Sequence, residues 1–72
     1  MPDIKREILE TLIEFPASGK WHKELNLVKW GEHPPKYDLR SWSADREQFS
    51  KGITLTKDEL KILKEGLGGI EL

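Results

Sequence analysis

Aromatic and basic side chains on two neighbouring stretches carry the clearest chemistry of this sequence. From Lys20 to Trp30, and again from Tyr37 to Ser43, residue types alternate as they do along strands. If the two stretches form a hairpin, this alternation allows Trp30, Arg40 and Trp42 to share one face. Indole rings stack on nucleobases and cations contact phosphates, so such a face is typical of proteins that bind single-stranded nucleic acid.

Further polar side chains extend this candidate surface. Asn26 shares the strand face of Trp30, and four lysines lie near the rims of the strands or just beyond them. The lysines are candidates for phosphate contacts. The candidate nucleic-acid-binding residues are therefore Lys23, Asn26, Lys29, Trp30, Lys36, Arg40, Trp42 and Lys51.

Each candidate also has a plainer structural interpretation. Tryptophan in a small domain is often a core residue, and this interpretation is strongest for Trp21. Arg40 can form an ion pair with Asp38, two positions earlier on the same strand face. The lysines can simply be solvated. For Trp21 the sequence leaves open whether it packs in the core or contacts nucleic acid.

The composition weighs against several other classes of function. The chain has 72 residues, with 12 Lys and Arg, 13 Asp and Glu and no Cys, and a formal net charge of −1. Nucleic-acid binders usually show a clear basic excess, so that function must rest on local charge placement. His22 and His33 have no cysteine or suitably spaced acid beside them, which argues against a metal site. We expect no enzyme activity, no cofactor and no small-molecule substrate.

The first segment, Ile4 to Phe15, is ambiguous. Its apolar spacing fits a helical stripe, although Ile8 to Glu14 also alternates as a strand would, and periodicity alone favours a helix. The stretches Lys20 to Trp30 and Tyr37 to Ser43 predict a hairpin, and Ile53 to Leu55 predicts a short further strand.

The C-terminal part of the chain predicts a helix. Thr56 and Glu59 have the spacing of a capping box, which predicts a helix that begins at Lys57. Leu60, Leu63 and Leu67 form an apolar stripe along that helix. Glycines that begin at residue 66 are expected to end it.

The small size of the chain predicts self-association. Domains of fewer than about 80 residues usually need a disulfide, a metal or oligomerisation, and only the last is open to this sequence. We therefore expect a homodimer. No apolar run is long enough to span a bilayer, and the first segment carries acids that a secretory signal would not, so the expected location is the cytoplasm, with no membrane contact.

Three stretches together resemble the single-stranded-DNA-binding domain of the transcriptional coactivator positive cofactor four, and most closely its bacterial YdbC-like branch. The stretches are Lys23 to Trp30 (KELNLVKW), Pro35 to Trp42 (PKYDLRSW) and Lys51 to Thr56 (KGITLT). The resemblance covers about residues 6–66.

The resemblance implies an α+β fold, a curved antiparallel sheet of four strands followed by a C-terminal helix (ββββα), in a dimer. On this basis Ile4 to Phe15 becomes a long twisted strand, with a bulge or bend that reconciles its helix-like spacing. The domain is expected to span 1–72, with its core at about 4–66 and a flexible tail at 67–72. The family also implies that Leu60, Leu63 and Leu67 contact the partner subunit.

The function implied by the resemblance is non-sequence-specific binding of single-stranded DNA by a homodimer, linked to transcription or to another process that exposes single strands. The family's DNA-contacting face matches Trp30 and Arg40, and Trp42 matches the aromatic residue that follows that arginine. RNA of similar exposure is an alternative ligand. A protein-interaction module that keeps the fold without binding nucleic acid is the alternative function, and a small helical adaptor is a third interpretation.

Overall fold

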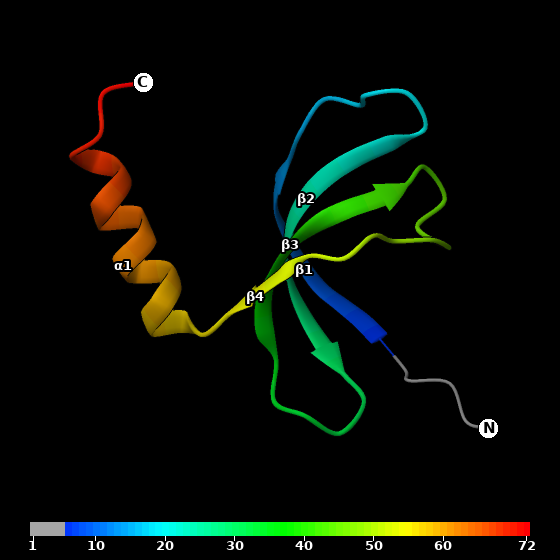
Figure 1. Ribbon diagram of the computed structural model, residues 1–72. Helices are drawn as coiled ribbons and strands as arrows, with labels where there is room; N and C mark the ends of the chain where they lie inside the picture. The colour runs from blue at the N-terminus through cyan, green and yellow to red at the C-terminus, as the bar shows by residue number, and fades with distance from the viewer. Residues whose placement is uncertain (1–5) are drawn as a thin grey trace.

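The structure is a computed structural model, and it describes residues 6–72. Four antiparallel strands form one open sheet in the order β1-β2-β3-β4, and a single helix follows them (Figure 1). This confirms the predicted ββββα fold. The elements are β1 (Arg6–Glu14), β2 (Trp21–Trp30), β3 (Lys36–Ser43), β4 (Ile53–Leu55) and α1 (Lys57–Gly68).

The first element is a strand with two irregularities, which explains its helix-like spacing. The register of β1 against β2 shifts between Ile8 and Glu10 and again between Thr11 and Ile13. Each shift inserts one extra residue and reverses the side-chain alternation. The prediction of a bulged strand is therefore confirmed over β1, while residues 4 and 5 lie outside the described part of the chain.

Strands β2 and β3 form the predicted hairpin and fix the two faces of the sheet. Glu24 is paired with Arg40, and Asn26 with Asp38, which puts even-numbered residues of both strands on one face. Gly31 has a φ of 56°, a conformation that glycine adopts without strain, and begins the turn. We call the face of His22, Glu24, Asn26, Val28, Trp30, Lys36, Asp38, Arg40 and Trp42 the inner face, and the opposite one the outer face.

The short strand β4 reaches β3 through a close contact at Gly52. A Cβ atom at this position would lie 2.4 Å from Arg40 Cβ and 2.5 Å from the Leu39 carbonyl oxygen. Only glycine fits such an approach without movement of the backbone. This contact places the segment before β4 directly against β3.

The helix begins where the sequence predicts. The Glu59 amide donates to Thr56 Oγ1 at 3.1 Å, and the Thr56 amide donates to Glu59 Oε1 at 2.8 Å, which completes the capping box. The helix continues to Gly68, two residues past the predicted core boundary. The flexibility of the tail at 67–72 stays a prediction.

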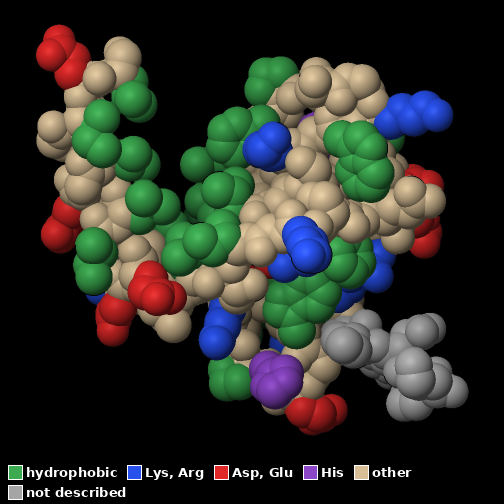
Figure 2. Space-filling model, viewed as in Figure 1, with side chains coloured by type: hydrophobic (Ala, Val, Ile, Leu, Met, Phe, Trp, Pro, Cys, Tyr) green, Lys and Arg blue, Asp and Glu red, His purple; other side chains and the backbone are tan. Residues whose placement is uncertain are grey.

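The buried residues lie on the inner face, and the helix contributes none. Among residues 6–72, those with no exposed surface are Glu24, Asn26, Val28, Asp38 and Trp42. The helix lies apart from most of the sheet, and hydrophobic side chains line both sides of the hollow between them (Figure 2). The single chain thus leaves its apolar outer surfaces uncovered.

Candidate nucleic-acid interface

Three aromatic rings form a cluster on the inner face. The Phe49 ring centroid lies 5.7 Å from that of Trp30 and 5.2 Å from that of Trp42. Phe49 reaches this position because its backbone forms an isolated bridge with Trp42, before the start of β4. Trp42 is fully buried beneath the cluster, whereas Phe49 is 39% exposed and Trp30 is half-buried.

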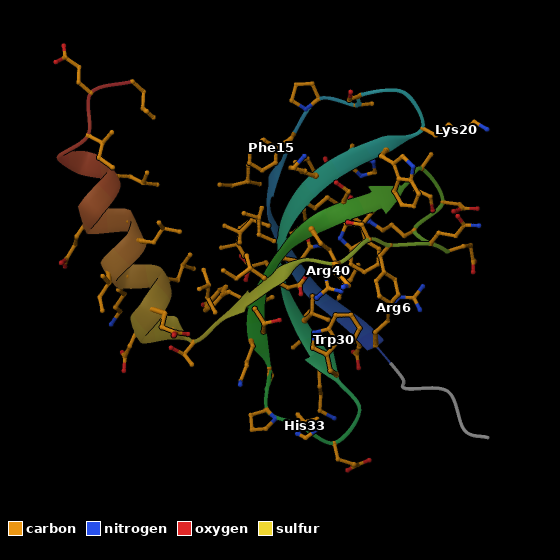
Figure 3. The ribbon with its side chains drawn as sticks, viewed as in Figure 1. Arg6, Phe15, Lys20, Trp30, His33 and Arg40 are labelled. Atoms are coloured by element: carbon orange, nitrogen blue, oxygen red, sulfur yellow. The ribbon has the colours of Figure 1, made fainter. Side chains whose placement is uncertain are left out.

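Two guanidinium groups stack on these rings. The Arg40 guanidinium carbon lies 4.8 Å from the Trp30 ring centroid and 5.3 Å from that of Phe49. The Arg6 guanidinium carbon lies 5.0 Å from the Phe49 centroid and 5.7 Å from that of Trp42. Arg6, Arg40 and Trp30 gather on the side of the sheet away from α1 (Figure 3). The guanidinium groups thus hold the rings in an arrangement that suits stacked bases.

Arg40 is also held from below by the buried Asp38. Its Nε donates to Asp38 Oδ1 at 2.6 Å, and its Nη2 donates to Asp38 Oδ2. Its Nη1 donates to the Ser50 carbonyl oxygen at 3.4 Å. The bidentate ion pair considered from the sequence is therefore present. Because its donors are used within the protein, Arg40 is better placed to fix the rings than to grip a phosphate.

Glu24 is the centre of a second buried network. Asn26 Nδ2 donates to Glu24 Oε1 at 2.9 Å, His22 Nε2 contacts Glu24 Oε2, and Arg46 Nη2 lies 2.9 Å from Glu24 Oε1. Burial by itself would raise the pKa of Glu24. The hydrogen bonds from Asn26, His22 and Arg46 outweigh it and hold this pKa below its ordinary value of 4.5. Glu24 is therefore a stable anion inside the inner face.

Arg46 closes this network from the segment that connects β3 to β4. It has a φ of 60°, which is uncommon for a residue other than glycine. Its Nη2 donates to Thr11 Oγ1 at 3.1 Å and lies 3.5 Å from Glu14 Oε1, so that it joins β1 to β2. The strained backbone is thus compensated by contacts with three side chains.

The structure also brings together three groups with the chemistry of metal ligands. Glu14, His22 and Glu24 offer ligand atoms that lie within 4.8 Å of one another. Local spacing does not indicate this group, because Glu14 lies on β1 and the other two residues lie on β2. The Arg46 guanidinium contacts both carboxylates, so a metal ion at this place would have to displace it.

The predicted binding residues divide between the two faces. The inner face holds Asn26, Trp30, Lys36, Arg40 and Trp42, whereas Lys23 and Lys29 occupy outer-face positions and Lys51 lies in the segment before β4. Trp30, Arg40 and Trp42 thus share a face, as the strand alternation predicts. Which of these residues contact nucleic acid stays a prediction.

Two of these side chains are fully buried and incompletely bonded. Asn26 Oδ1 and Trp42 Nε1 have no hydrogen-bond partner among residues 6–72. Buried polar atoms without partners are uncommon and often mark a place where water or a ligand completes the bonding. In this conformation Trp42 cannot stack directly on a base, because Phe49 and Arg6 lie over it.

Sequence reasoning missed Phe49, Arg6 and Arg46. Phe49 is the one aromatic residue in the polar segment between Ser43 and Gly52, and that isolation is the signal that could identify it. Arg6 enters the site because Arg6 pairs with Trp30 across β1 and β2. Nothing in the local sequence indicates that Arg46 adopts a left-handed backbone conformation.

Comparison with known proteins agrees with this arrangement. Residues 17–66 match the family described as "Transcriptional Coactivator p15 (PC4)". A protein of Treponema pallidum (strain Nichols), described as "Uncharacterized protein", is 40% identical over 71 residues, which cover 97% of this chain and 84% of that protein. Within residues 6–72, no helix is long and apolar enough to cross a membrane. The match covers more than half of the chain and includes β2, β3, β4 and most of α1, and the chain therefore belongs to the PC4 family.

Proposed function

We propose that this protein binds single-stranded DNA, without reading its sequence, through the inner face of its sheet. The observation that carries the proposal is the pair of partly exposed rings on that face, Trp30 and Phe49, against which the guanidinium groups of Arg40 and Arg6 are stacked. Aromatic rings offer stacking surfaces to any base, and cations neutralise the backbone, which is why such binding tolerates any sequence. Membership of the PC4 family supports the same conclusion.

Within this proposal the aromatic residues have different roles. Trp30 and Phe49 keep exposed ring surface and are the stacking residues. Trp42 supports Phe49 from below and acts as a positioning residue. Lys36 and Lys51 are exposed and lie at the rim of the inner face and before β4, where they provide phosphate contacts.

The proposed functional unit is a homodimer. Among residues 6–72, Val28 and Trp42 are the only hydrophobic residues that are buried, while Leu63 and Leu67 of α1 are 43% and 47% exposed. Apolar surface of this extent normally marks a protein interface. A second copy packed against the hollow between α1 and the sheet would cover Leu60, Leu63 and Leu67 together.

The proposed cellular role is transcription, or another process that exposes single strands, in the bacterial cytoplasm. The family description supports the link to transcription, and the Treponema relative supports a bacterial setting. RNA with unpaired bases offers the same stacking surfaces and is the alternative ligand. The alternative function is a protein-interaction module, which the acidic side chains on β1 favour, since Glu7, Glu10 and Glu14 are all exposed.

A fluorescence titration distinguishes these functions. Addition of an oligo-dT of about 20 nucleotides should quench the tryptophan emission, because a stacked base quenches indole fluorescence. Trp30→Ala and Phe49→Ala should each weaken binding by about 5- to 100-fold, the equivalent of one lost base stack. An unchanged emission spectrum over the whole titration would contradict the proposal and favour the protein-interaction module.

The salt dependence of the same titration tests the lysines. Lys36→Gln and Lys51→Gln should each reduce the slope of log K against log salt by about 0.7, the value for one phosphate contact to a single strand. Lys57→Gln, at the start of α1, is the matched control and should leave the slope unchanged. Equal slopes in all three variants would remove these lysines from the interface.

A further inference from the structure

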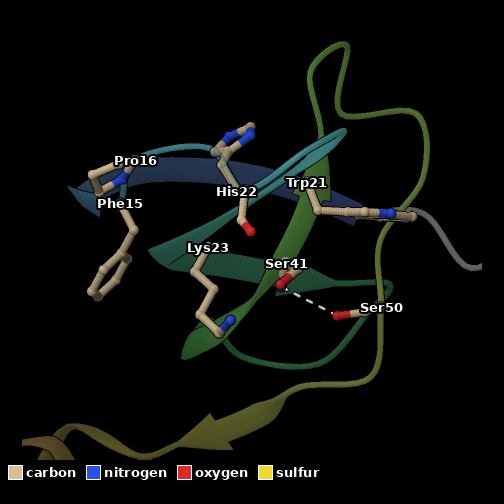
Figure 4. Close-up of a pocket in the computed structure, with 8 residues that line it drawn as sticks. Phe15, Pro16, Trp21, His22, Lys23, Ser41 and Ser50 are labelled. Carbon is tan, nitrogen blue, oxygen red and sulfur yellow. Dashed lines mark hydrogen bonds between the residues drawn. The ribbon is translucent and has the colours of Figure 1, made fainter.

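A second hollow lies at the end of the sheet where β1 turns into β2. Its volume is about 570 Å³, which is within the range of pockets that hold small ligands. Phe15, which follows β1, and Trp21, which begins β2, line it together with Lys23 and Ser41. Figure 4 shows Phe15 and Lys23 pointing to one side of the sheet and the imidazole of His22 pointing to the other. His22 also lines the pocket, and since its imidazole contacts Glu24 on the inner face, the pocket borders the ionic network of that face.

The chemistry of this pocket is unlike that of the rest of the surface. The chain has 13 acidic residues, yet the residues that line the pocket, all within the described part of the chain, include no carboxylate. Lys23 is exposed and forms no ion pair with any residue from 6 to 72. Phe15 is 42% exposed and Trp21 is 38% exposed, so that both offer ring surface. An aromatic surface beside a free cation suits a base that is linked to a phosphate.

The pocket adjoins the proposed DNA-binding face, because residues of the two sites are neighbours along β2 and β3. His22 is paired with Trp42, and the next pair in the ladder is Lys23 with Ser41. Phe49 belongs to the inner-face cluster, while its neighbour Ser50 lines the pocket. The Ser41 amide donates to Ser50 Oγ at 3.2 Å, which holds these two serines together at the boundary (Figure 4).

We infer that this pocket binds one nucleotide of a strand that leaves the inner face and crosses the end of β2 and β3. Its base stacks on Trp21, and its phosphate contacts Lys23. This inference rests on the proposed function and extends it, because the bound DNA strand would then contact both faces of the sheet. It also gives Trp21 a role as a contact residue.

The charge of Lys23 argues against a second copy of the chain as the occupant. A protein partner that sealed the pocket would bury the ammonium group, which is costly unless the partner supplies a carboxylate. A phosphate supplies the opposite charge directly.

The test is an NMR titration of the full chain with oligo-dT of about 20 nucleotides, followed through the three indole N–H signals. These signals are assigned with single Trp→Phe variants. The Trp21 signal should shift together with that of Trp30. Trp21→Ala should weaken binding by at least about fivefold, the low end for a lost stack. Lys23→Gln should lower the salt slope by about 0.7.

Lys20→Gln is the matched control, because Lys20 lies in the same hairpin and does not line the pocket. A shift of the Trp30 signal without one at Trp21, with Lys23→Gln equal to Lys20→Gln, would overturn this inference and leave the proposed function intact. Absence of any oligonucleotide binding would overturn both. Dissociation of the dimer in Trp21→Ala or Lys23→Gln, measured by sedimentation, would assign the pocket to the subunit interface and overturn the inference alone.

Discussion

The two sides of this molecule reverse the usual arrangement of a small domain. The inner face buries charges, since Glu24 and Asp38 have no exposed surface and each is paired with an arginine. The other side exposes hydrophobic residues, since Ile13 on β1 and Ile53 on β4 are 47% and 53% exposed. Isolated domains normally bury apolar groups and expose charged ones. The inner face thus pairs its buried charges within one chain, while the exposed hydrophobic residues of the opposite side offer the surface for the dimer that we propose.

The largest expected effect comes from charging the incomplete side. Leu63→Lys combined with Leu67→Lys should raise the dimer dissociation constant by more than about 1,000-fold, since each buried leucine contributes about 1.5–3 kcal/mol and four are lost per dimer. Sedimentation equilibrium measures this change. The melting temperature of the unaltered protein should rise with its concentration, as it does for coupled dimers. A concentration-independent melting temperature would contradict the dimer.

The next effect separates the two tryptophans of the inner face. Trp42→Ala should lower the free energy of unfolding by about 3–5 kcal/mol, because it leaves a cavity under Phe49. Trp30→Ala should cost only about 1 kcal/mol in stability, because Trp30 is half-buried, although it weakens DNA binding. Urea unfolding of both variants measures the difference. Equal losses of stability would mean that Trp30 is a core residue as well.

A smaller effect concerns the buried carboxylate of Glu24. Its pKa is lower in the folded state than in the unfolded state, so its stabilising contribution is present above the unfolded pKa and is lost as the pH falls through the folded pKa. Glu24→Gln should lower the free energy of unfolding by about 1–3 kcal/mol at neutral pH, because Arg46 and His22 lose their partner.

The acid dependence gives the control for this prediction. Below the folded pKa of Glu24, the difference in stability between the unaltered protein and Glu24→Gln should become smaller. Glu10→Gln, an exposed carboxylate on β1 outside the network, should leave stability nearly unchanged at every pH. A difference that stayed constant from neutral to acid pH would show that the charge of Glu24 does not stabilise the fold.

The fold could be predicted from the sequence wherever a local rule decided the conformation. The capping box at Thr56 and the alternation along β2 and β3 are such rules, and both are confirmed. In β1 the periodicity by itself favoured a helix, because two inserted residues mimic helical spacing. The family resemblance gave the correct strand there, where local pattern could not.

The site could be predicted only in part, because its completion depends on contacts distant in sequence. Alternation placed Trp30, Arg40 and Trp42 on one face, but it could not reveal that Phe49 covers Trp42. Alternation along a strand predicts which face a side chain occupies, but it does not predict which other residues cover that side chain. Thr11 and Arg46 are 35 positions apart and are joined by a hydrogen bond. This is a second example of a contact that no local pattern encodes.

The left-handed backbone at Arg46 affects how often the buried Trp42 side chain becomes exposed to solvent. Arg46 and Phe49 are three residues apart in the segment between β3 and β4, and we expect loss of the contact between Arg46 and Glu24 to loosen the hold of this segment on the phenyl ring that covers the indole. The rate at which the Trp42 indole hydrogen exchanges with deuterium therefore measures how often this segment opens. Substitution of Arg46 by glycine relaxes the φ angle and also removes the contact with Glu24. It should therefore increase the exchange rate of the Trp42 indole hydrogen.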